Sequence, residues 1–565
     1  MKLKDLRTSK SLKQDECAII AGVSLRTYKK YENDPTLEGS VKYNHIYQLI
    51  KEYEQKDFHL KVVTGNDLKT LTSIVKDYDT RDCFEILKDY YQKPFPNKVL
   101  ILYGLRRTGK TTLIFQSIRL LKYHKCAYIK ASPSNNMQEL LSDIEALRKK
   151  GYKYLFIDEI TLLDDFIDGA AVLSDIFANL DLKIVLSGTD SLGFYFTSLN
   201  ELYDRSIIVH TSYIPFREFV RLLDIPDIDM YIAYGGSLKK PNINFDDERY
   251  KYEELSFADD ETTRKYINSS IVKNILHSLK NDNIGNKYNK LKELYDESEL
   301  VNVINRIINN YNHAFIIRVI NEIFKSNDLG AGKTLLLHEE NETLRNALYT
   351  VDEKEVLKRM KEILEIKERD DKQIEITPLH LEQLKDYLYK LDLIDDIEVH
   401  FDNGEIEKHT IFTQPGMRYS LVEALIHSLS KDPHFASLKN EDMTYITYKL
   451  LDNVRGMMLE DITLYETKKV SKNKDVFKYK TFNEGEYDMV IYDKEKNTCH
   501  LYEIKHSHAF VFDQQTRHLR NDALLNKIMN KYGAIASKNV LYRGLPRTVD
   551  NINFIDIEDY LFYIA

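Results

Sequence analysis

The segment Gly104 to Thr111 reads GLRRTGKT, which has the residue types and spacing of a phosphate-binding loop. Glycines allow the backbone N–H groups to turn toward phosphate oxygens, a lysine neutralises phosphate charge, and the following hydroxyl can hold Mg²⁺. We therefore assign Lys110 to the phosphates and Thr111 to the metal ion. The expected ATP-binding residues of this loop are Gly104, Leu105, Arg106, Arg107, Thr108, Gly109, Lys110, Thr111 and Thr112.

An acidic pair follows the loop after about fifty residues, in the string YLFIDEI. Four apolar residues place Asp158 and Glu159 at the carboxyl end of a buried strand, which is where such sheets bind ligands. We expect Asp158 to hold Mg²⁺ through water and Glu159 to orient the attacking water. The next apolar run ends in SGTDS, so Ser187 and Thr189 are candidate sensors of the terminal phosphate. A plain turn after a strand is the alternative for these two residues.

A second group of carboxylates lies near the end of the chain. The apolar runs 487–492 and 498–504 are separated by DKEKN, which predicts a β-hairpin. The hairpin would bring Asp488 beside Glu503 and Lys505, and the last two share a face because they are two residues apart. Carboxylates around Mg²⁺ or Mn²⁺, with a lysine nearby, can hydrolyse phosphodiesters. The predicted catalytic set is Asp488, Glu503 and Lys505; an ordinary strand end is the alternative.

An upstream helix adds an acid to this second group. The helix from Met457 offers Glu460, which matches the helix acid of the PD-(D/E)xK nucleases that this region resembles. That resemblance implies Glu460, Asp488 and Glu503 as the metal ligands. Gln515 follows the core strands and is a weaker candidate, because a solvated loop is the simpler interpretation there.

The N-terminal segment has the pattern of two short helices around a tight turn. Leu12 to Ala21 predicts the first helix, Gly22 the turn, and Ser24 the N-cap of a helix from Leu25 to Glu32. Residues 1–32 hold eight basic side chains against four acidic ones, although the whole chain is acidic. The segment resembles the helix-turn-helix of phage repressors, which implies duplex DNA as a partner. The candidate DNA contacts are Gln14, Arg26, Thr27 and Lys30; a small helical packing or oligomerisation domain is the alternative.

The elements that must position these residues change in type along the chain. Short apolar runs (VLILY, CAYIK, YLFID, KIVLSG) alternate with helical stretches after Val99, which predicts a parallel sheet with crossover helices. The fold class is therefore multidomain α/β. We expect an all-α helix-turn-helix domain at 1–56, a linker and helix at 57–96, a P-loop ATPase core at 97–225, a helical lid and connector at 226–375, a winged-helix-like segment at 376–435, and an α/β nuclease-like domain at 436–565.

A second loop-like string, GAGKT at 330–334, is set aside as a nucleotide site. The first glycine of the full pattern would fall on Asn327, and no apolar strand precedes it.

Several strings together resemble a known family over about residues 80 to 545. GLRRTGKTTL, LFIDEI, VLSGTDS, IPFREF and YIAYGGSLKKP look like prokaryotic AAA-type ATPases whose C-terminal domain is related to PD-(D/E)xK nucleases. That family has a Gly-Arg pair before the IPFREF-like string, where this chain has Tyr203-Asp204-Arg205. The resemblance makes Arg205 the candidate arginine finger, and an arginine on a solvated helix end is the alternative.

Composition limits the function classes. The 565-residue chain has a net charge of -9, so a DNA contact has to be local. Its four cysteines are far apart and predict neither a zinc site nor a disulfide framework. The absence of a signal-like or membrane-spanning run favours a cytoplasmic protein with no membrane partner.

The combined expectation is an ATP- and Mg²⁺-dependent, DNA-associated ATPase with a Mg²⁺-dependent nuclease-like C-terminal domain. Such a combination suits genome defence or a mobile element. A homo-oligomer through the ATPase domain is left open. The alternative from another class is a nucleotide-gated regulator that binds a partner or operator and cuts nothing.

Overall fold

The computed structural model contains three structured regions, and a few intervening stretches are not described. The described residues are 2–9, 13–52, 58–163, 165–189, 194, 202, 204–238, 257–279, 287–294, 297–325, 353–372 and 377–564. The GAGKT string at 330–334 lies outside them.

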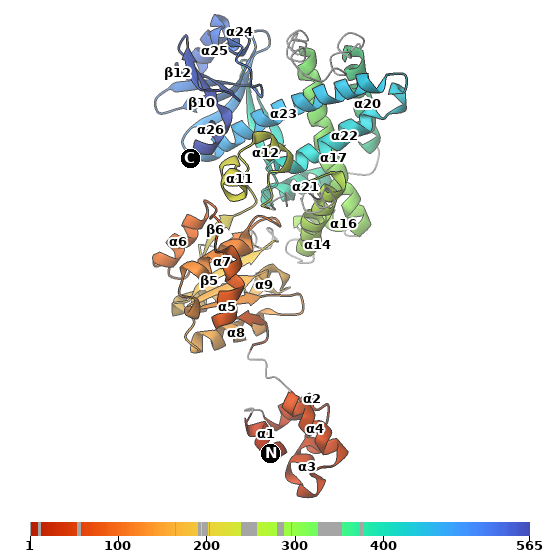
Figure 1. Ribbon diagram of the computed structural model, residues 1–565, viewed down its shortest axis with the longest axis vertical. Helices are drawn as coiled ribbons and strands as arrows, with labels where there is room; N and C mark the ends of the chain where they lie inside the picture. The colour runs from red at the N-terminus through yellow and green to blue at the C-terminus, as the bar shows by residue number, and fades with distance from the viewer. Residues whose placement is uncertain are drawn as a thin grey trace.

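The N-terminal region is a small helical unit, drawn in red in Figure 1. Its elements are α1 (Leu3–Ser9), α2 (Gln14–Ile20), α3 (Leu25–Asn33), the 3₁₀ turn η1 (Pro35–Leu37) and α4 (Val41–Glu52). Leu6, Cys17, Tyr28 and Ile46 are buried between the helices, so the unit has an apolar core of its own. Ser24 caps α3, because its side chain accepts a hydrogen bond from the Thr27 N–H.

The middle region is built on a six-stranded sheet with the order β1-β3-β4-β5-β2-β6. The strands are β1 (Lys61–Val63), β2 (Val99–Tyr103), β3 (Cys126–Lys130), β4 (Tyr154–Asp158), β5 (Lys183–Gly188) and β6 (Ser206–His210). All neighbours pair in parallel except β1 and β3. The four predicted apolar runs form β2, β3, β4 and β5, and every residue of β2 is buried, as expected for a covered parallel sheet.

Helices cover both faces of this sheet (Figure 1). They include α5 (Gly65–Leu71), η2 (Thr72–Val75), α6 (Phe84–Gln92), α7 (Lys110–Leu120), α8 (Met137–Lys149), α9 (Phe166–Gly169), and the short turns η3 (Tyr123–Lys125), η4 (Ile160–Leu162), η5 (Leu173–Phe177) and η6 (Ala178–Leu180). The expected linker at 57–96 therefore requires correction. Its β1 is an edge strand of the sheet, and Asp143 of α8 accepts hydrogen bonds from the N–H groups of His59 and Leu60.

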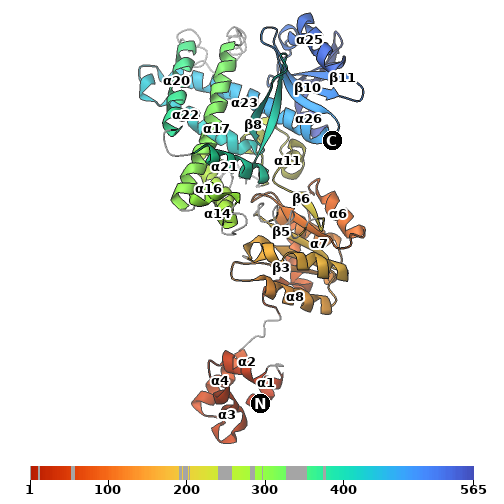
Figure 2. The ribbon, with the colours of Figure 1, turned by 180° about the vertical axis from the view of Figure 1, so that it is seen from behind.

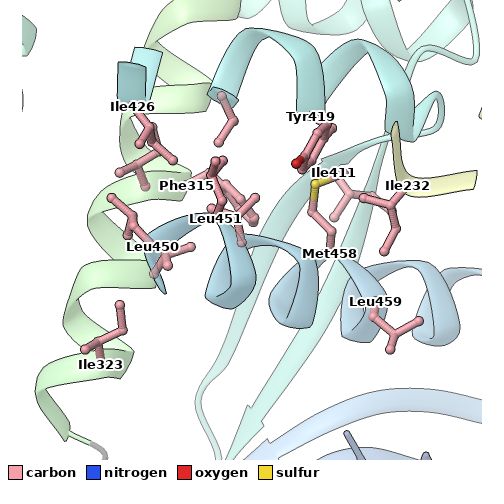
Figure 3. Packing of buried hydrophobic residues seen from close by; sticks show 14 of the residues in the cluster. Ile232, Phe315, Ile323, Ile411, Tyr419, Ile426, Leu450, Leu451, Met458 and Leu459 are labelled. Carbon is pink, nitrogen blue, oxygen red and sulfur yellow. The ribbon is translucent and has the colours of Figure 1, made fainter. Parts of the chain in front are cut away.

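A helical region connects the six-stranded sheet with the C-terminal region. It contains α11 (Phe216–Leu223), α12 (Ile228–Tyr234), α13 (Asp260–Ile267), η8 (Asn268–Val272), α14 (Lys273–Leu279), α16 (Asn289–Glu293), α17 (Glu297–Lys325), α20 (Glu353–Lys372) and α21 (Pro378–Lys390). Figure 3 shows how Ile232 of α12 and Phe315 of α17 meet side chains of two later helices, α22 (Pro415–Ser430) and α23 (Asn440–Val470). The described helices of the connector thus share this core with α22 and α23.

The C-terminal region has an eight-stranded sheet with the order β13-β14-β12-β11-β10-β9-β7-β8. Figure 2 shows this sheet with β8, β10 and β11 labelled. Its strands are β7 (Ile394–Phe401), β8 (Ile406–Phe412), β9 (Asp475–Lys480), β10 (Glu486–Asp493), β11 (Thr498–Ile504), β12 (Ala534–Tyr542), β13 (Arg547–Val549) and β14 (Ile552–Asp556). The remaining helices are η9 (Pro433–Phe435), α24 (Phe512–Gln515), η10 (His518–Arg520), α25 (Asp522–Tyr532) and α26 (Ile557–Tyr563).

The winged-helix-like segment at 376–435 requires a second correction. Its helix and hairpin are present as α21, β7 and β8, but β7 pairs in parallel with β9. The hairpin therefore belongs to the C-terminal sheet and is not a separate wing.

No helix within the described ranges is both long and apolar enough to cross a membrane.

Candidate functional site

The phosphate-binding loop connects β2 to α7 at the carboxyl edge of the first sheet. Gly104 has φ +155°, and a Cβ atom there would lie 2.4 Å from the Thr211 hydroxyl, so only glycine fits. Gly109 is also in the left-handed region and forms the N-cap of α7. The loop therefore has the backbone freedom that wrapping a phosphate requires.

The Lys110 side chain lies inside this loop. Its Nζ donates to the carbonyl oxygens of Gly104 at 2.7 Å and Leu105 at 2.8 Å. Burial lowers the pKa of Lys110 to about 8, and the nearby carboxylates Glu159 and Asp158 oppose that change. An ammonium that is poorly solvated and held by carbonyls is ready to exchange them for phosphate oxygens.

Asp158 is the centre of a polar network at the end of β4. One carboxylate oxygen accepts hydrogen bonds from the Thr111 hydroxyl at 3.2 Å and from Lys130 Nζ at 3.0 Å, and Ser187 donates to the other oxygen. Burial alone would raise the pKa of Asp158, but the Ser187 hydrogen bond and the Lys130 charge hold it below its ordinary value. Asp158 is therefore ionised at neutral pH.

Glu159 follows directly in a left-handed conformation, with φ +59°. The Thr189 hydroxyl makes a long hydrogen bond of 3.5 Å to its carboxylate, and Asn274 of α14 donates to the Thr189 carbonyl at 2.9 Å. The structure thus places Ser187 beside Asp158 and Thr189 beside Glu159, with a residue of the helical region next to them.

These residues fit a magnesium nucleotide. The Thr111 hydroxyl and the Asp158 carboxylate are hard oxygen ligands, the kind that Mg²⁺ prefers, and they lie close together beside the loop. They would hold the ion, which would neutralise phosphate charge.

Arg205 lies at the wrong end of the sheet to serve the loop of its own molecule. It precedes β6 at the amino end of the strands, where its carbonyl accepts a hydrogen bond from the Val99 N–H. Its guanidinium is 3.2 Å from the Asp175 carboxylate. Because the phosphate-binding loop follows the opposite end of β2, Arg205 does not reach the loop of its own molecule, and its role as an arginine finger stays a prediction.

Arg81 is a residue that the sequence analysis missed. It is buried and donates to the carbonyls of Thr108, Thr211 and Tyr213, and it pairs with Glu218 of α11 at 2.7 Å. Arg81 therefore joins the phosphate-binding loop to the helix that leads into the C-terminal region. A single arginine before a helix gives no local signal of such long-range contacts.

The predicted hairpin near the C-terminus forms as β10 and β11, and its register places Asp488 beside Glu503. Asp488 accepts a hydrogen bond from the Ile504 N–H at 2.8 Å, and Lys505 Nζ lies 3.2 Å from Asp488 and 2.9 Å from Glu503. Both carboxylates are almost fully buried. The structure thus brings Asp488, Glu503 and Lys505 together.

Glu460 joins this cluster through a lysine that the sequence analysis missed. The helix α23 that carries it begins at Asn440, well before the expected Met457. Lys478 Nζ of β9 lies 2.8 Å from Glu460, 3.4 Å from Glu486 and 3.7 Å from Asp488. Burial raises the pKa of Glu460 to about 7, partly offset by Lys478.

Two lysines lie among the carboxylates of this cluster, so a divalent metal would have to displace Lys478. The Lys478 ammonium lies among the carboxylates that would have to converge on an ion, and Lys505 bridges the other two. Across the part of the chain that the structure describes, no group of three or more His, Cys, Asp or Glu side chains is arranged to hold a metal.

Two further residues complete the surroundings of Glu503. His518 Nδ1 lies 3.2 Å from its carboxylate, and that contact raises the pKa of His518. Gln515 does not reach the cluster. It is buried in its own loop, where it accepts from the Val511 N–H and donates to the Ala509 carbonyl.

The four candidate DNA contacts differ in the exposure of their side chains and in the hydrogen bonds that they make. Arg26 and Lys30 are exposed on α3. Thr27 shares a hydrogen bond of 2.8 Å with the capping Ser24, and Gln14 donates to Glu32. The two basic residues are thus the more available pair.

Comparison with known proteins identifies the middle region. A family model described as an AAA domain matches residues 96–220. An uncharacterized protein of Methanocaldococcus jannaschii is 25% identical over 211 residues, which are 35% of this chain and 46% of that protein. The chain thus spans about half the length of that relative.

Two solved structures share limited similarity with the chain. The ORC1 protein of Aeropyrum pernix in complex with DNA has 15% identity and a TM-score of 0.21, over 66% of this chain and 93% of that one. The Hsp104–ADP complex of S. cerevisiae has 12% identity and a TM-score of 0.23, over 72% and 57%. With TM-scores this low, neither similarity supports a conclusion about this chain. Residues 96–220 are similar to AAA domains, and the chain as described is a mixed α/β protein with a parallel-sheet, P-loop ATPase-like core.

Proposed function

We propose that this protein binds and hydrolyses ATP and associates with duplex DNA through its N-terminal helices. The observation that carries the proposal is the convergence of Lys110, Thr111, Asp158 and Glu159 at one edge of the first sheet. In this site Lys110 neutralises phosphate charge, and Glu159 orients the attacking water. Thr189 fixes the Glu159 carboxylate by the hydrogen bond described above.

DNA association is proposed from the N-terminal unit alone. A capped helix α3 presents Arg26 and Lys30 to solvent on an otherwise acidic chain, and basic residues of such a helix can reach phosphates or base edges. We also propose the domain ranges that were expected from the sequence, with two changes to their boundaries. Residues 57–96 join the ATPase core, and the hairpin of 376–435 joins the C-terminal sheet.

For the C-terminal region we propose a nuclease-like domain, supported by the grouping of Asp488, Glu503 and Lys505 on neighbouring strands. A role in genome defence or a mobile element belongs to the same proposal. A specific observation favours the second candidate, a nucleotide-gated regulator that cuts nothing: Lys478 lies among the carboxylates where an ion would have to bind.

One experiment tests both candidates. Purified protein is incubated with plasmid DNA, Mg²⁺ or Mn²⁺, and with or without ATP, while phosphate release and DNA cleavage are followed together. Phosphate release without cleavage supports the regulator, and cleavage that disappears in Glu503→Ala supports the nuclease. Absence of phosphate release under all conditions contradicts the proposed ATPase.

A further inference from the structure

A cavity of about 230 Å³ lies beside the phosphate-binding loop. Its walls are formed by the loop and by the helical stretch α13–η8. The lining residues are Arg106, Arg107, Thr262, Lys265, Tyr266, Ser269 and Ser270. Lys110, Thr111 and Asp158 are not among them, so this cavity differs from the position where the loop backbone cradles a phosphate.

The chemistry of the lining is that of an anion site. Three side chains are cationic, none is acidic, and the remaining ones offer hydroxyl groups. The Lys265 ammonium also pairs with Glu261 at 2.6 Å, but both side chains are largely exposed, and such a surface pair is weak. An anion in the cavity can therefore compete for Lys265 at little cost.

The floor of the cavity contains a polar atom without a partner. Ser270 is 1% exposed, and its hydroxyl oxygen makes no hydrogen bond to any residue that the structure describes. A buried hydroxyl that lacks a partner is costly, and this one belongs to a residue that lines the cavity. Nearby, the Tyr266 hydroxyl donates to the Arg106 carbonyl at 3.4 Å and accepts from Gln414 at 3.1 Å. The wall that carries Ser270 is thus fixed against the loop.

We propose that this cavity binds a phosphate group in addition to the one that the loop backbone holds. Arginine and lysine side chains with hydroxyl donors are the usual partners of phosphate oxygens. The phosphate has two sources: the terminal part of the bound nucleotide, in which case the inference rests on the proposed ATP site, or a separate phosphate-bearing ligand.

The test uses the full chain and three variants. Lys265→Ala and Ser270→Ala remove one cation and one hydroxyl from the cavity. Lys273→Ala is the matched control, because Lys273 is an exposed lysine at the start of α14 that does not line the cavity. Lys265 is exposed, and Ser270 makes no side-chain hydrogen bond within the described ranges, so neither change is expected to unfold the protein. Thermal melting checks this.

Two arms separate the sources. In the first, binding of inorganic pyrophosphate to ADP-saturated protein is measured by calorimetry; a separate ligand predicts one site whose affinity falls about tenfold in Lys265→Ala and in Ser270→Ala. In the second, affinities for fluorescent ATP and ADP analogues are compared; a nucleotide phosphate predicts that the same variants lose ATP affinity more than ADP affinity. Lys273→Ala should stay within twofold of wild type in both arms.

The proposal is overturned if Lys265→Ala and Ser270→Ala match Lys273→Ala in both arms. Its failure is distinct from failure of the ATPase proposal. If wild-type protein binds no ATP analogue while pyrophosphate binding still depends on Lys265, the ATPase proposal falls and the cavity remains a phosphate site.

Discussion

At the scale of single residues, Lys110 and Glu159 carry separable steps. Lys110→Ala should abolish ATP binding, because the loop then lacks its neutralising charge, whereas Glu159→Gln should bind ATP but not hydrolyse it. Binding of a fluorescent ATP analogue and phosphate release measure the two steps.

Arg205→Ala tests whether Arg205 acts on the ATP site of a neighbouring molecule. Because Arg205 lies at the far end of the strands, ATP binding should persist, and a loss of turnover that depends on protein concentration would indicate action on a neighbouring molecule.

Lys478 gives a second residue-scale prediction. Lys478→Met removes the lysine that pairs with Glu460, whereas Glu486 keeps Lys480 and Asp488 keeps Lys505. Breaking a buried ion pair of this kind costs about 3–5 kcal/mol of stability. We expect a lower melting temperature than for the wild type, and a partial recovery with Mn²⁺ that the wild type does not show.

Lys494→Met is the matched control, because Lys494 pairs with Asp475 on an exposed surface. The Lys494 variant should melt at nearly the temperature of the wild type, because exposed ion pairs contribute little to stability. If Mn²⁺ stabilises the wild type as much as Lys478→Met, the lysine does not exclude a metal from the cluster.

At the scale of elements, Glu466 links α23 to α11 and α12. It accepts hydrogen bonds from the Phe216 N–H at 2.7 Å and from the Tyr231 hydroxyl at 3.2 Å. Burial raises its pKa from 4.5 to about 7, opposed by the Phe216 hydrogen bond. The folded protein thus holds its proton more tightly than the unfolded chain does.

The pH dependence follows from that direction. Below about pH 4.5 the Glu466 carboxyl is protonated in both the folded and the unfolded state, so it does not lower the free energy of unfolding. Between that pH and about 7 the free energy of unfolding falls, because the unfolded state ionises first. Above pH 7 this loss of stability is fully present. Glu466→Gln keeps the acceptor oxygen and removes the ionisation. It should raise the free energy of unfolding by up to about 3 kcal/mol at pH 8 and by little at pH 4. Urea unfolding at the two pH values measures this, and an equal effect at both would contradict the raised pKa.

The sequence predicted those elements that are marked by an unbroken apolar run or by a clear turn sequence. The run VLILY is buried at every position, and the DKEKN turn fixes the register of β10 and β11. The pattern could not predict that β7 pairs with β9, because 73 residues separate Phe401 from Asp475 and parallel pairing leaves no turn signal. Lys478 was missed for the same reason, since its role depends on that placement.

At the scale of the whole molecule, DNA binding should depend on the N-terminal unit. Arg26→Ala with Lys30→Ala should weaken duplex binding and reduce the slope of log affinity against log salt by about 2, because each lost phosphate contact releases about one counterion fewer. Fluorescence anisotropy at several salt concentrations measures both effects.

Lys42→Ala is the control for this experiment, since Lys42 is an exposed lysine on α4. If the double variant keeps the wild-type affinity and slope, the N-terminal unit packs or oligomerises and does not read DNA.

The pairing of β7 with β9 also determines how the chain can be divided. A fragment that starts at residue 436 would lack β7 and β8, and the N–H and C=O groups on one side of β9 would lose their partners. An uncovered strand of this kind pairs with copies of itself. Such a fragment should form aggregates in size-exclusion chromatography, and β-strand association should therefore be considered before loss of activity in a truncated protein is attributed to missing catalytic residues.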